Sequence, residues 1–213
     1  MNRFFLLLGG SLLLTSPARA QAGVQVGGNL GSFRAPTAID VQTSARALPG
    51  YHLGVFYHLA LSPRLALVPQ VQYSRERLDL TQVSPGLVDG GYQATYRERF
   101  SYLNVPVLLR LSCGAFYVEA GPQAGYLLGG RETGRVEYTG FTRTAPYEVD
   151  RTVVGRYRRV DVGPSVGVGL QLPAGVGLAV RAYHGLVSLA PAGEAPLYRQ
   201  SLLAGLTYRL ARR

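Results

Sequence analysis

The sequence predicts an all-β chain that folds as an eight-stranded antiparallel up-and-down transmembrane β-barrel. Three observations lead to this prediction. Segments of the chain alternate apolar and polar side chains with a period of two, the connections between them are alternately short and long, and the N-terminus is typical of a secretory signal. No internal apolar run approaches the roughly 20 residues that a spanning helix needs, so a membrane crossing has to be made by strands.

The N-terminal segment has the three parts of a signal peptide. Arg3 supplies the charge, Phe4 to Leu14 the apolar run, and Ala18-Arg19-Ala20 a small-x-small cleavage site. We expect residues 1–20 to be cleaved and residues 21–213 to form the barrel domain. A membrane-anchoring helix is disfavoured because the run is too short. Export from the cytoplasm argues against a nucleic-acid role, and together with the predicted barrel it predicts location in the outer membrane of a Gram-negative cell.

The formal charge is +10, and removal of Arg3 and Arg19 leaves 20 basic and 12 acidic residues, a net +8. Every basic residue is Arg, and Lys is absent. A base-composition bias of the genome is the favoured explanation, while the functional alternative is that Arg pairs with phosphates such as those of lipopolysaccharide. The single cysteine, Cys113, excludes an internal disulfide, so we expect stability to come from strand pairing and packing.

Alternation is clearest in the segment 101–110. One face carries Leu103, Val105, Val107 and Leu109, and the other carries Tyr102, Asn104, Leu108 and Arg110. In water the apolar face would line a core, whereas in a lipid-embedded barrel the apolar face points outward. Comparable patterns predict eight strands, at 23–34, 50–61, 64–79, 97–111, 115–130, 159–172, 175–189 and 197–210.

The connections alternate in length without exception. Short turns are expected at 62–64, 112–114 and 172–175, and longer connections at 35–49, 80–96, 131–158 and 190–196. This is the layout of an outer-membrane barrel with periplasmic turns, extracellular loops and both termini in the periplasm. A soluble barrel or sandwich is the alternative. The signal, the loop asymmetry and an expected girdle of Tyr51, Tyr73 and Tyr208 favour the membrane.

Four predicted strands contain an internal proline, at positions 69, 106, 122 and 164. Proline cannot donate a ladder hydrogen bond, and a closed barrel has no free edge for it. We therefore expect bulges or local kinks in the third to sixth predicted strands.

The segment Tyr102-Leu-Asn-Val-Pro-Val-Leu-Leu-Arg110 resembles a strand of the PorT-like outer-membrane β-barrel family, the outer membrane protein β-barrel domain of Bacteroidetes. Segments 160–169, 181–187 and 198–208 resemble further strands of that family. The resemblance implies a membrane barrel over nearly all of the mature chain, and the family's name implies a link to protein secretion. The chain departs from the usual barrel ending, because it stops at Leu210-Ala-Arg-Arg213 without a terminal aromatic residue, a role that Tyr208 could take instead.

A polar network is expected inside the barrel, formed by Arg110, Glu119, Asp161, Arg181 and Arg199. The interior of an eight-stranded barrel is just wide enough for side chains to fill, and buried charges need partners. We therefore predict a plugged lumen, with a small passive pore as the alternative.

An enzyme is not expected, and the least favoured alternative is a lipid-modifying one. His52 and His58 share a strand face about 20 Å apart, and His184 points toward lipid, so no triad or metal site is apparent. The sequence accordingly predicts no catalytic residue, metal or cofactor.

The longest connection, 131–158, mixes arginines, acids and aromatic residues, as surfaces that contact partners do. The residues proposed for such a surface are Arg143, Tyr147, Arg151, Arg156 and Tyr157. A solvated loop, or a hairpin that extends the flanking strands, is the simpler interpretation and is slightly favoured. We predict a monomer with a structural or loop-mediated interaction role, with lipopolysaccharide and a protein as candidate partners.

Overall fold

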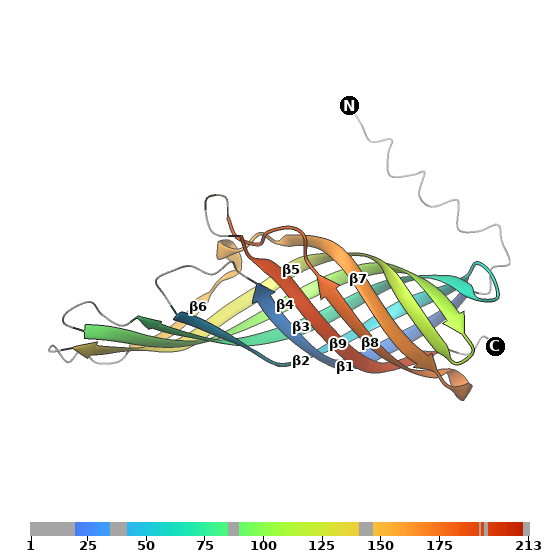
Figure 1. Cartoon of the computed structure of the whole chain (residues 1–213), viewed down its shortest axis with the longest axis horizontal. Helices are drawn as coiled ribbons and strands as arrows, with labels where there is room; N and C mark the ends of the chain where they lie inside the picture. Colours follow the sequence, from blue (N-terminus) through green and yellow to red (C-terminus); the bar gives the residue numbers. More distant parts are fainter. Residues whose placement is uncertain are drawn as a thin grey trace, which may run out of the picture.

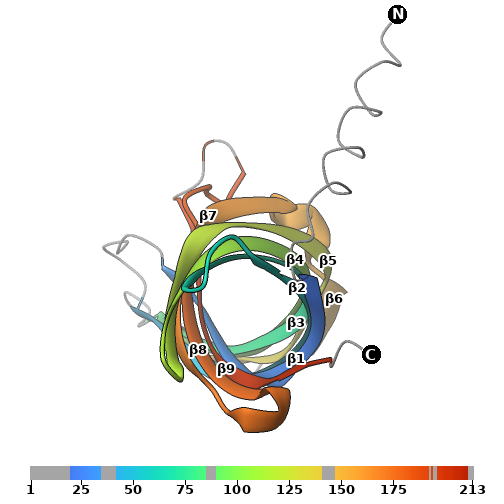
Figure 2. The same cartoon turned by 90° about the vertical axis from the view of Figure 1, so that its right-hand side faces the viewer.

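The computed structural model describes residues 20–34, 42–84, 90–140, 147–191, 193 and 196–210. Within them, eight strands close into an antiparallel ring in sequence order, and a short ninth strand extends one side (Figures 1 and 2). The ring closes because β1 pairs with both β2 and β9. The elements are β1 (Ala20–Arg34), β2 (Gln42–Ala60), β3 (Leu65–Ser84), β4 (Gly90–Cys113), β5 (Phe116–Gly140), β6 (Tyr147–Thr152), η1 (Val154–Arg156), β7 (Val160–Gln171), η2 (Pro173–Gly175), β8 (Val176–His184) and β9 (Tyr198–Arg209).

The predicted fold class is confirmed, and so is the inverted alternation. Along β4, Leu103, Val105, Val107 and Leu109 point outward and are exposed, while the residues between them are buried inside the ring. The same holds on the other strands, so an outward apolar band surrounds a polar interior. On β4 and β5 the upper limit of this band lies at Leu103 and Leu128. None of the described helical segments has the length and apolarity that a bilayer crossing requires.

Four strands are longer than predicted. β2 begins at residue 42, β3 reaches residue 84, β4 begins at residue 90 and β5 continues to residue 140, so much of the expected loop sequence is strand. Above the apolar band the outward residues are polar, and the inward residues mix apolar side chains such as Leu78 with acids such as Glu98. This mixture obscures the alternation that marks a strand in the sequence. β6 adds to the outer half of β5, as the hairpin interpretation of 131–158 expected. Residues 42–48, 77–84, 90–99, 131–140 and 147–152 project together beyond the barrel (Figure 1). We call them the extracellular sheet, because they continue the strands into the connections that the loop pattern predicts to be extracellular.

β8 is shorter than predicted and ends at His184. The next backbone groups pair irregularly, since the Gly185 N–H donates to the Arg199 carbonyl and the Leu186 N–H donates to the Val162 carbonyl. The carboxylate of Asp161 fills the space beside Gly185, where a Cβ atom would lie 2.5 Å from Asp161 Oδ1. A side chain at position 185 would therefore collide with the lumen network, so only glycine fits there.

The three short turns are confirmed. At 62–64, the N–H groups of Leu61 and Ser62 both donate to the Leu65 carbonyl at 2.9 Å. Gly114 supplies the positive φ of the second turn, at 64°. In the third turn Ala174 and Gly175 have φ angles of 63° and 84°, so one non-glycine residue adopts the left-handed conformation.

The register shifts do not lie at the four internal prolines. They occur between Leu48 and Tyr51, around Pro49, and between Ser101 and Tyr102. At the internal prolines the register is kept: Pro69 lies opposite Val107, and Pro122 lies opposite Pro164. The prolines gather in one zone of neighbouring strands, where some ladder pairs are missing, so the ring loses hydrogen bonds there without slipping.

Candidate functional site

The lower part of the lumen is filled by a network around one carboxylate. Arg110 Nε and Nη2 donate to Glu119 Oε2 at 3.0 and 2.7 Å, and Arg181 Nε and Nη2 donate to Glu119 Oε1 at 3.1 and 2.7 Å. Arg181 Nη1 also donates to Gln70 Oε1 at 2.9 Å. The same Gln70 oxygen accepts a second hydrogen bond from Gln25 Nε2 at 3.0 Å. All five side chains are buried and each comes from a different strand, so this network joins β1, β3, β4, β5 and β8 across the ring.

The upper part of the lumen is filled by a second network around Arg199. Its guanidinium binds Glu76 with a shortest distance of 2.6 Å, and Nη1 donates to Asn104 Oδ1 at 3.0 Å. Ser201 Oγ donates to Glu76 Oε1 at 2.7 Å. Asp161 Oδ2 lies 3.6 Å from Arg199 Nη1, so this carboxylate is held by charge at longer range.

Two arginines also stack on aromatic rings inside the barrel. The guanidinium carbon of Arg110 lies 3.8 Å from the centroid of the Tyr117 ring, and that of Arg199 lies 3.9 Å from the centroid of the Tyr102 ring. Such contacts stabilise a cation that has been removed from water. The lumen is therefore packed, as the size of an eight-stranded ring requires.

The structure places all five sequence-predicted lumen residues inside the ring, but in two networks. Arg110, Glu119 and Arg181 belong to the lower one, and Arg199 and Asp161 to the upper one. The central acid of the upper network, Glu76, was not predicted. A signal was present, because Glu76 shares the strand face of Gln70, Gln72 and Ser74, but its two arginine neighbours in the sequence obscured it.

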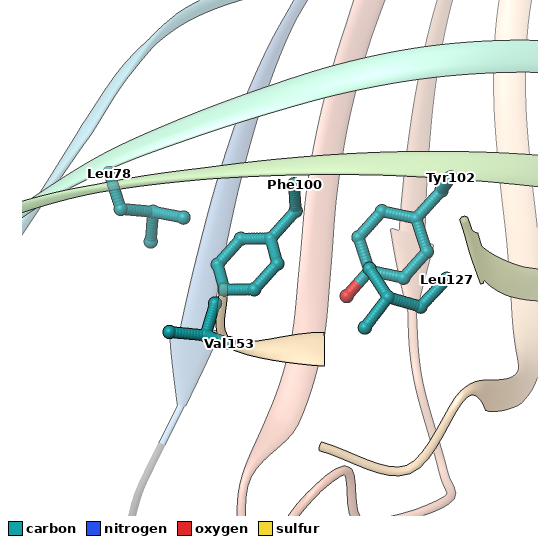
Figure 3. Close-up of a cluster of buried hydrophobic side chains, with 5 residues drawn as sticks. All are labelled: Leu78, Phe100, Tyr102, Leu127 and Val153. Atoms are coloured by element: carbon teal, nitrogen blue, oxygen red, sulfur yellow. The ribbon is translucent and has the colours of Figure 1, made fainter. Parts of the chain in front are cut away.

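An apolar plug lies above the upper network, made by Leu78, Phe100, Tyr102, Leu127 and Val153 (Figure 3). All five are fully buried, and Phe33, Val154 and Tyr157 pack against them. Val153 comes from the segment between β6 and β7, which folds back over the ring opening and is held by its N–H donating to the Gly130 carbonyl at 3.1 Å. This end of the lumen is thus covered by side chains.

A pair of carboxylates lies at the extracellular rim of the plug, above the apolar band. Glu98 and Glu132 are directly opposite on β4 and β5, and both are buried. The Tyr157 hydroxyl donates to Glu98 Oε1 at 3.2 Å, and Arg151 and Arg156 bind Glu132 at 2.6 and 3.4 Å. Burial, and then the charge of Glu132, raises the pKa of Glu98 to about 7.

The surface-loop candidates therefore differ in location. Arg151 and Arg156 have about half of their side chains exposed while they hold Glu132. Tyr157 packs its ring against Phe100, with centroids 5.4 Å apart, so it belongs to the plug's rim and not to an open surface. The sequence suggested a surface residue because a lone aromatic in a polar segment does not reveal what it packs against. Tyr147 begins β6, and Arg143 lies outside the described residues.

The histidines are far apart in the barrel wall. His52 is buried inside the ring, whereas His184 lies on the outer face, where its Nδ1 is 2.9 Å from Gln200 Nε2. Among the described residues, no group of three or more His, Cys, Asp or Glu side chains could hold a metal ion.

The extracellular sheet carries exposed ion pairs on its outer face. Arg97 binds Asp79 at 2.9 Å and Arg131 binds Asp150 at 2.6 Å. The tyrosines just below form part of the expected girdle: the rings of Tyr51 and Tyr73 lie 6.2 Å apart at the upper edge of the apolar band.

A family model described as the outer membrane protein beta-barrel domain matches residues 15–190. The chain belongs to this family. It is therefore a protein of the cell outer membrane, as the fold and the outward apolar band indicate. The matching description names the barrel domain alone, so the PorT-like resemblance stays a prediction.

Several solved barrels have a similar fold. Ail, the attachment invasion locus protein of Yersinia pestis, is 9% identical with a TM-score of 0.43, and the match covers 90% of this chain and 99% of Ail. Neisserial surface protein A is 10% identical with a TM-score of 0.44 and the same two coverages. The outer membrane protease OmpT of Escherichia coli is 9% identical with a TM-score of 0.34, covering 90% of this chain and 96% of OmpT. No curated protein matches the sequence.

Proposed function

We propose that this chain is a plugged outer-membrane barrel whose extracellular sheet is the surface at which it contacts a partner protein. The observation that carries the proposal is the filled lumen. Two networks centred on Glu119 and Arg199 occupy the interior, and the apolar plug lies above them. Side chains that fill the interior in this way support a lumen without a continuous water column, so we assign the function to the part outside the membrane.

The extracellular sheet suits that role by its reach and its edges. On β4 and β5 it is ten residues long, which corresponds to about 30 Å of strand. Within the described residues, β6 pairs only with β5, and residues 42–48 of β2 pair only with β3. Each of these edges offers unpaired backbone groups to an extended segment of a partner, the geometry of strand addition.

A single copy meets the needs of the membrane-embedded part, because its ring is closed and leaves no strand edge in lipid. We therefore propose a monomer. The PorT-like resemblance at residues 102–110 supports a partner that belongs to protein secretion, with this chain as an accessory component.

The test compares exported and surface proteins of the wild-type strain with those of a strain that lacks this chain. The deletion strain is complemented either with the full chain or with a shortened one. In the shortened chain, one Asn-Gly turn replaces residues 80–96 and another replaces residues 134–149. These cut points are chosen because Asp79 lies directly opposite Arg97 and Thr133 directly opposite Asp150, and a two-residue turn can join such a pair. A heat-dependent shift on a denaturing gel serves as the folding control.

We expect a specific set of proteins to be trapped in the periplasm of the deletion strain, with rescue by the full chain only. Rescue by the shortened chain would show that the contact surface does not lie in residues 80–96 or 134–149, the parts of the extracellular sheet that this chain lacks. An unchanged set of exported proteins would refute the secretion role, and conductance in a planar bilayer would then favour the alternative of a passive pore.

A further inference from the structure

The outer face of β3, β4 and β5 carries a ladder of arginines just above the apolar band. Arg77 lies directly opposite Arg99, and Arg99 lies directly opposite Arg131. Directly opposite residues on neighbouring strands have Cβ atoms about 5 Å apart. Arg75 lies one outward position below Arg77 on the same strand, so the ladder forms a compact cationic cluster.

The two aspartates of this face offset only part of the charge of the cluster, although Asp150 lies close enough to Arg99 for the charge of Arg99 to lower the pKa of Asp150. Asp79 is bound by Arg97, and Asp150 forms a bidentate pair with Arg131 through its Nε and Nη2 atoms. Among the described residues, no carboxylate lies within ion-pair distance of Arg77 or Arg99. On the described parts of β2 to β6, the charged outward residues level with positions 75–79 of β3 are six arginines and two aspartates, namely Arg46, Arg75, Arg77, Arg97, Arg99, Arg131, Asp79 and Asp150. Like charges directly opposite each other on a sheet destabilise it unless an anion lies between them.

The height of the cluster identifies the source of that anion. The row Tyr73, Leu103 and Tyr126 crosses the same three strands at the top of the apolar band. Arg77 is four residues further along β3 than Tyr73, about 13 Å of strand, which a tilt of about 40° reduces to about 10 Å above the girdle. The headgroup layer extends about 5–8 Å beyond the hydrocarbon. Arg75, two residues above Tyr73, lies at that level, and the long side chain of Arg77 can reach down to it from just above. On the opposite flank, the corresponding outward positions of β8 and β9 carry His184 and Gln200.

We propose that Arg75, Arg77 and Arg99 form a binding site for the phosphate groups of an outer-leaflet lipid of the lipid A class. The planar guanidinium fork donates two parallel hydrogen bonds to a phosphate, and a neutral headgroup offers no such charged acceptor. Arg77 is exposed and Arg99 is half-buried, so both can reach a headgroup lying against β3 and β4. The site is distinct from the proposed protein-contact edges, since it uses the outer face of the sheet.

Native mass spectrometry of the folded full-length barrel in zwitterionic detergent tests this site. The probes are diphosphorylated lipid A, the same lipid after enzymatic dephosphorylation, and inorganic phosphate. The site variant is Arg77→Gln/Arg99→Gln. The matched control is Arg64→Gln/Arg212→Gln, which removes the same charge at the exposed periplasmic turn and near the C-terminus. The heat-dependent gel shift confirms folding of each variant.

We expect the affinity for diphosphorylated lipid A to be about tenfold higher in the wild type and the control than in the site variant. Each guanidinium lost from the site variant removes charge-assisted hydrogen bonds to phosphate. The dephosphorylated lipid should bind equally weakly to all three. Equal binding of lipid A by the site variant and the control would overturn the proposal. If inorganic phosphate displaced the lipid at equal concentration, the cluster would be a site for a soluble anion and the assignment to a lipid headgroup would be wrong.

Discussion

Substitution of Glu119 by Gln should destabilise the barrel more than any loss of an exposed ion pair. The carboxylate accepts four hydrogen bonds from Arg110 and Arg181, and only 1% of its side chain is exposed. In the variant the amide oxygen can still accept hydrogen bonds from one arginine. The amide nitrogen faces the guanidinium of the other arginine, and because both groups are donors they cannot form a hydrogen bond. Two buried arginines then lack a counter-charge, which costs about 3–5 kcal/mol.

The assay is urea unfolding of the barrel in lipid vesicles, followed by the heat-dependent shift on a denaturing gel. The matched control is Asp150→Asn, which breaks an ion pair whose side chains are 63% and 52% exposed and should cost below about 1 kcal/mol. A third variant replaces Arg110, Glu119 and Arg181 together by Met, and it should be more stable than Glu119→Gln because no buried charge is left unpaired. If Glu119→Gln were as stable as Asp150→Asn, the lower network would not hold the ring together as argued here.

Three further predictions concern the plug, its rim and a turn. Phe100→Ala should lower the free energy of unfolding by about 3 kcal/mol, because it leaves a cavity in the plug; a loss no larger than that of Asp150→Asn in urea unfolding would contradict this packing. Because burial raises the folded pKa of Glu98 to about 7, its contribution to stability should be fully present below about pH 4.5 and should fall by up to about 3 kcal/mol as the pH rises through 7. The difference in unfolding midpoint between wild type and Glu98→Gln, measured from about pH 4 to 9, should show this slope, and a constant difference would contradict it. Ala174→Gly should stabilise the barrel by about 1 kcal/mol because φ is 63°, and a lower unfolding midpoint in urea would argue against a left-handed turn there.

The membrane-embedded part of the fold could be predicted from the sequence because lipid imposes a strict local pattern. Every strand that crosses the apolar band alternates side chains, so segments such as 101–110 are recognisable on their own. The extracellular sheet lacks that constraint. In Arg97-Glu98-Arg99 the inward and outward residues are all charged, and only the pairing of the backbone shows that they form a strand.

The lumen residues could be predicted individually, but their partners could not. Parity along a strand places Arg199 inside the ring, yet its partner Glu76 is 123 positions away in the sequence. Which acid it meets depends on the register of every strand between them. The location of Tyr157 could not be predicted for the same reason. Its packing against Phe100 depends on a segment that folds back over the ring opening.

The central claim is that the lumen is closed by packed side chains, and single-channel recording in a planar bilayer tests it most directly. A porin inserted under the same conditions serves as the positive control, and the heat-dependent gel shift verifies folding before insertion. We predict no discrete current steps from the wild-type barrel at voltages at which the porin conducts. Reproducible steps from the folded wild-type protein, altered by Phe100→Ala or Arg199→Ala, would show that a water path runs through the two networks and the plug, and would contradict this account.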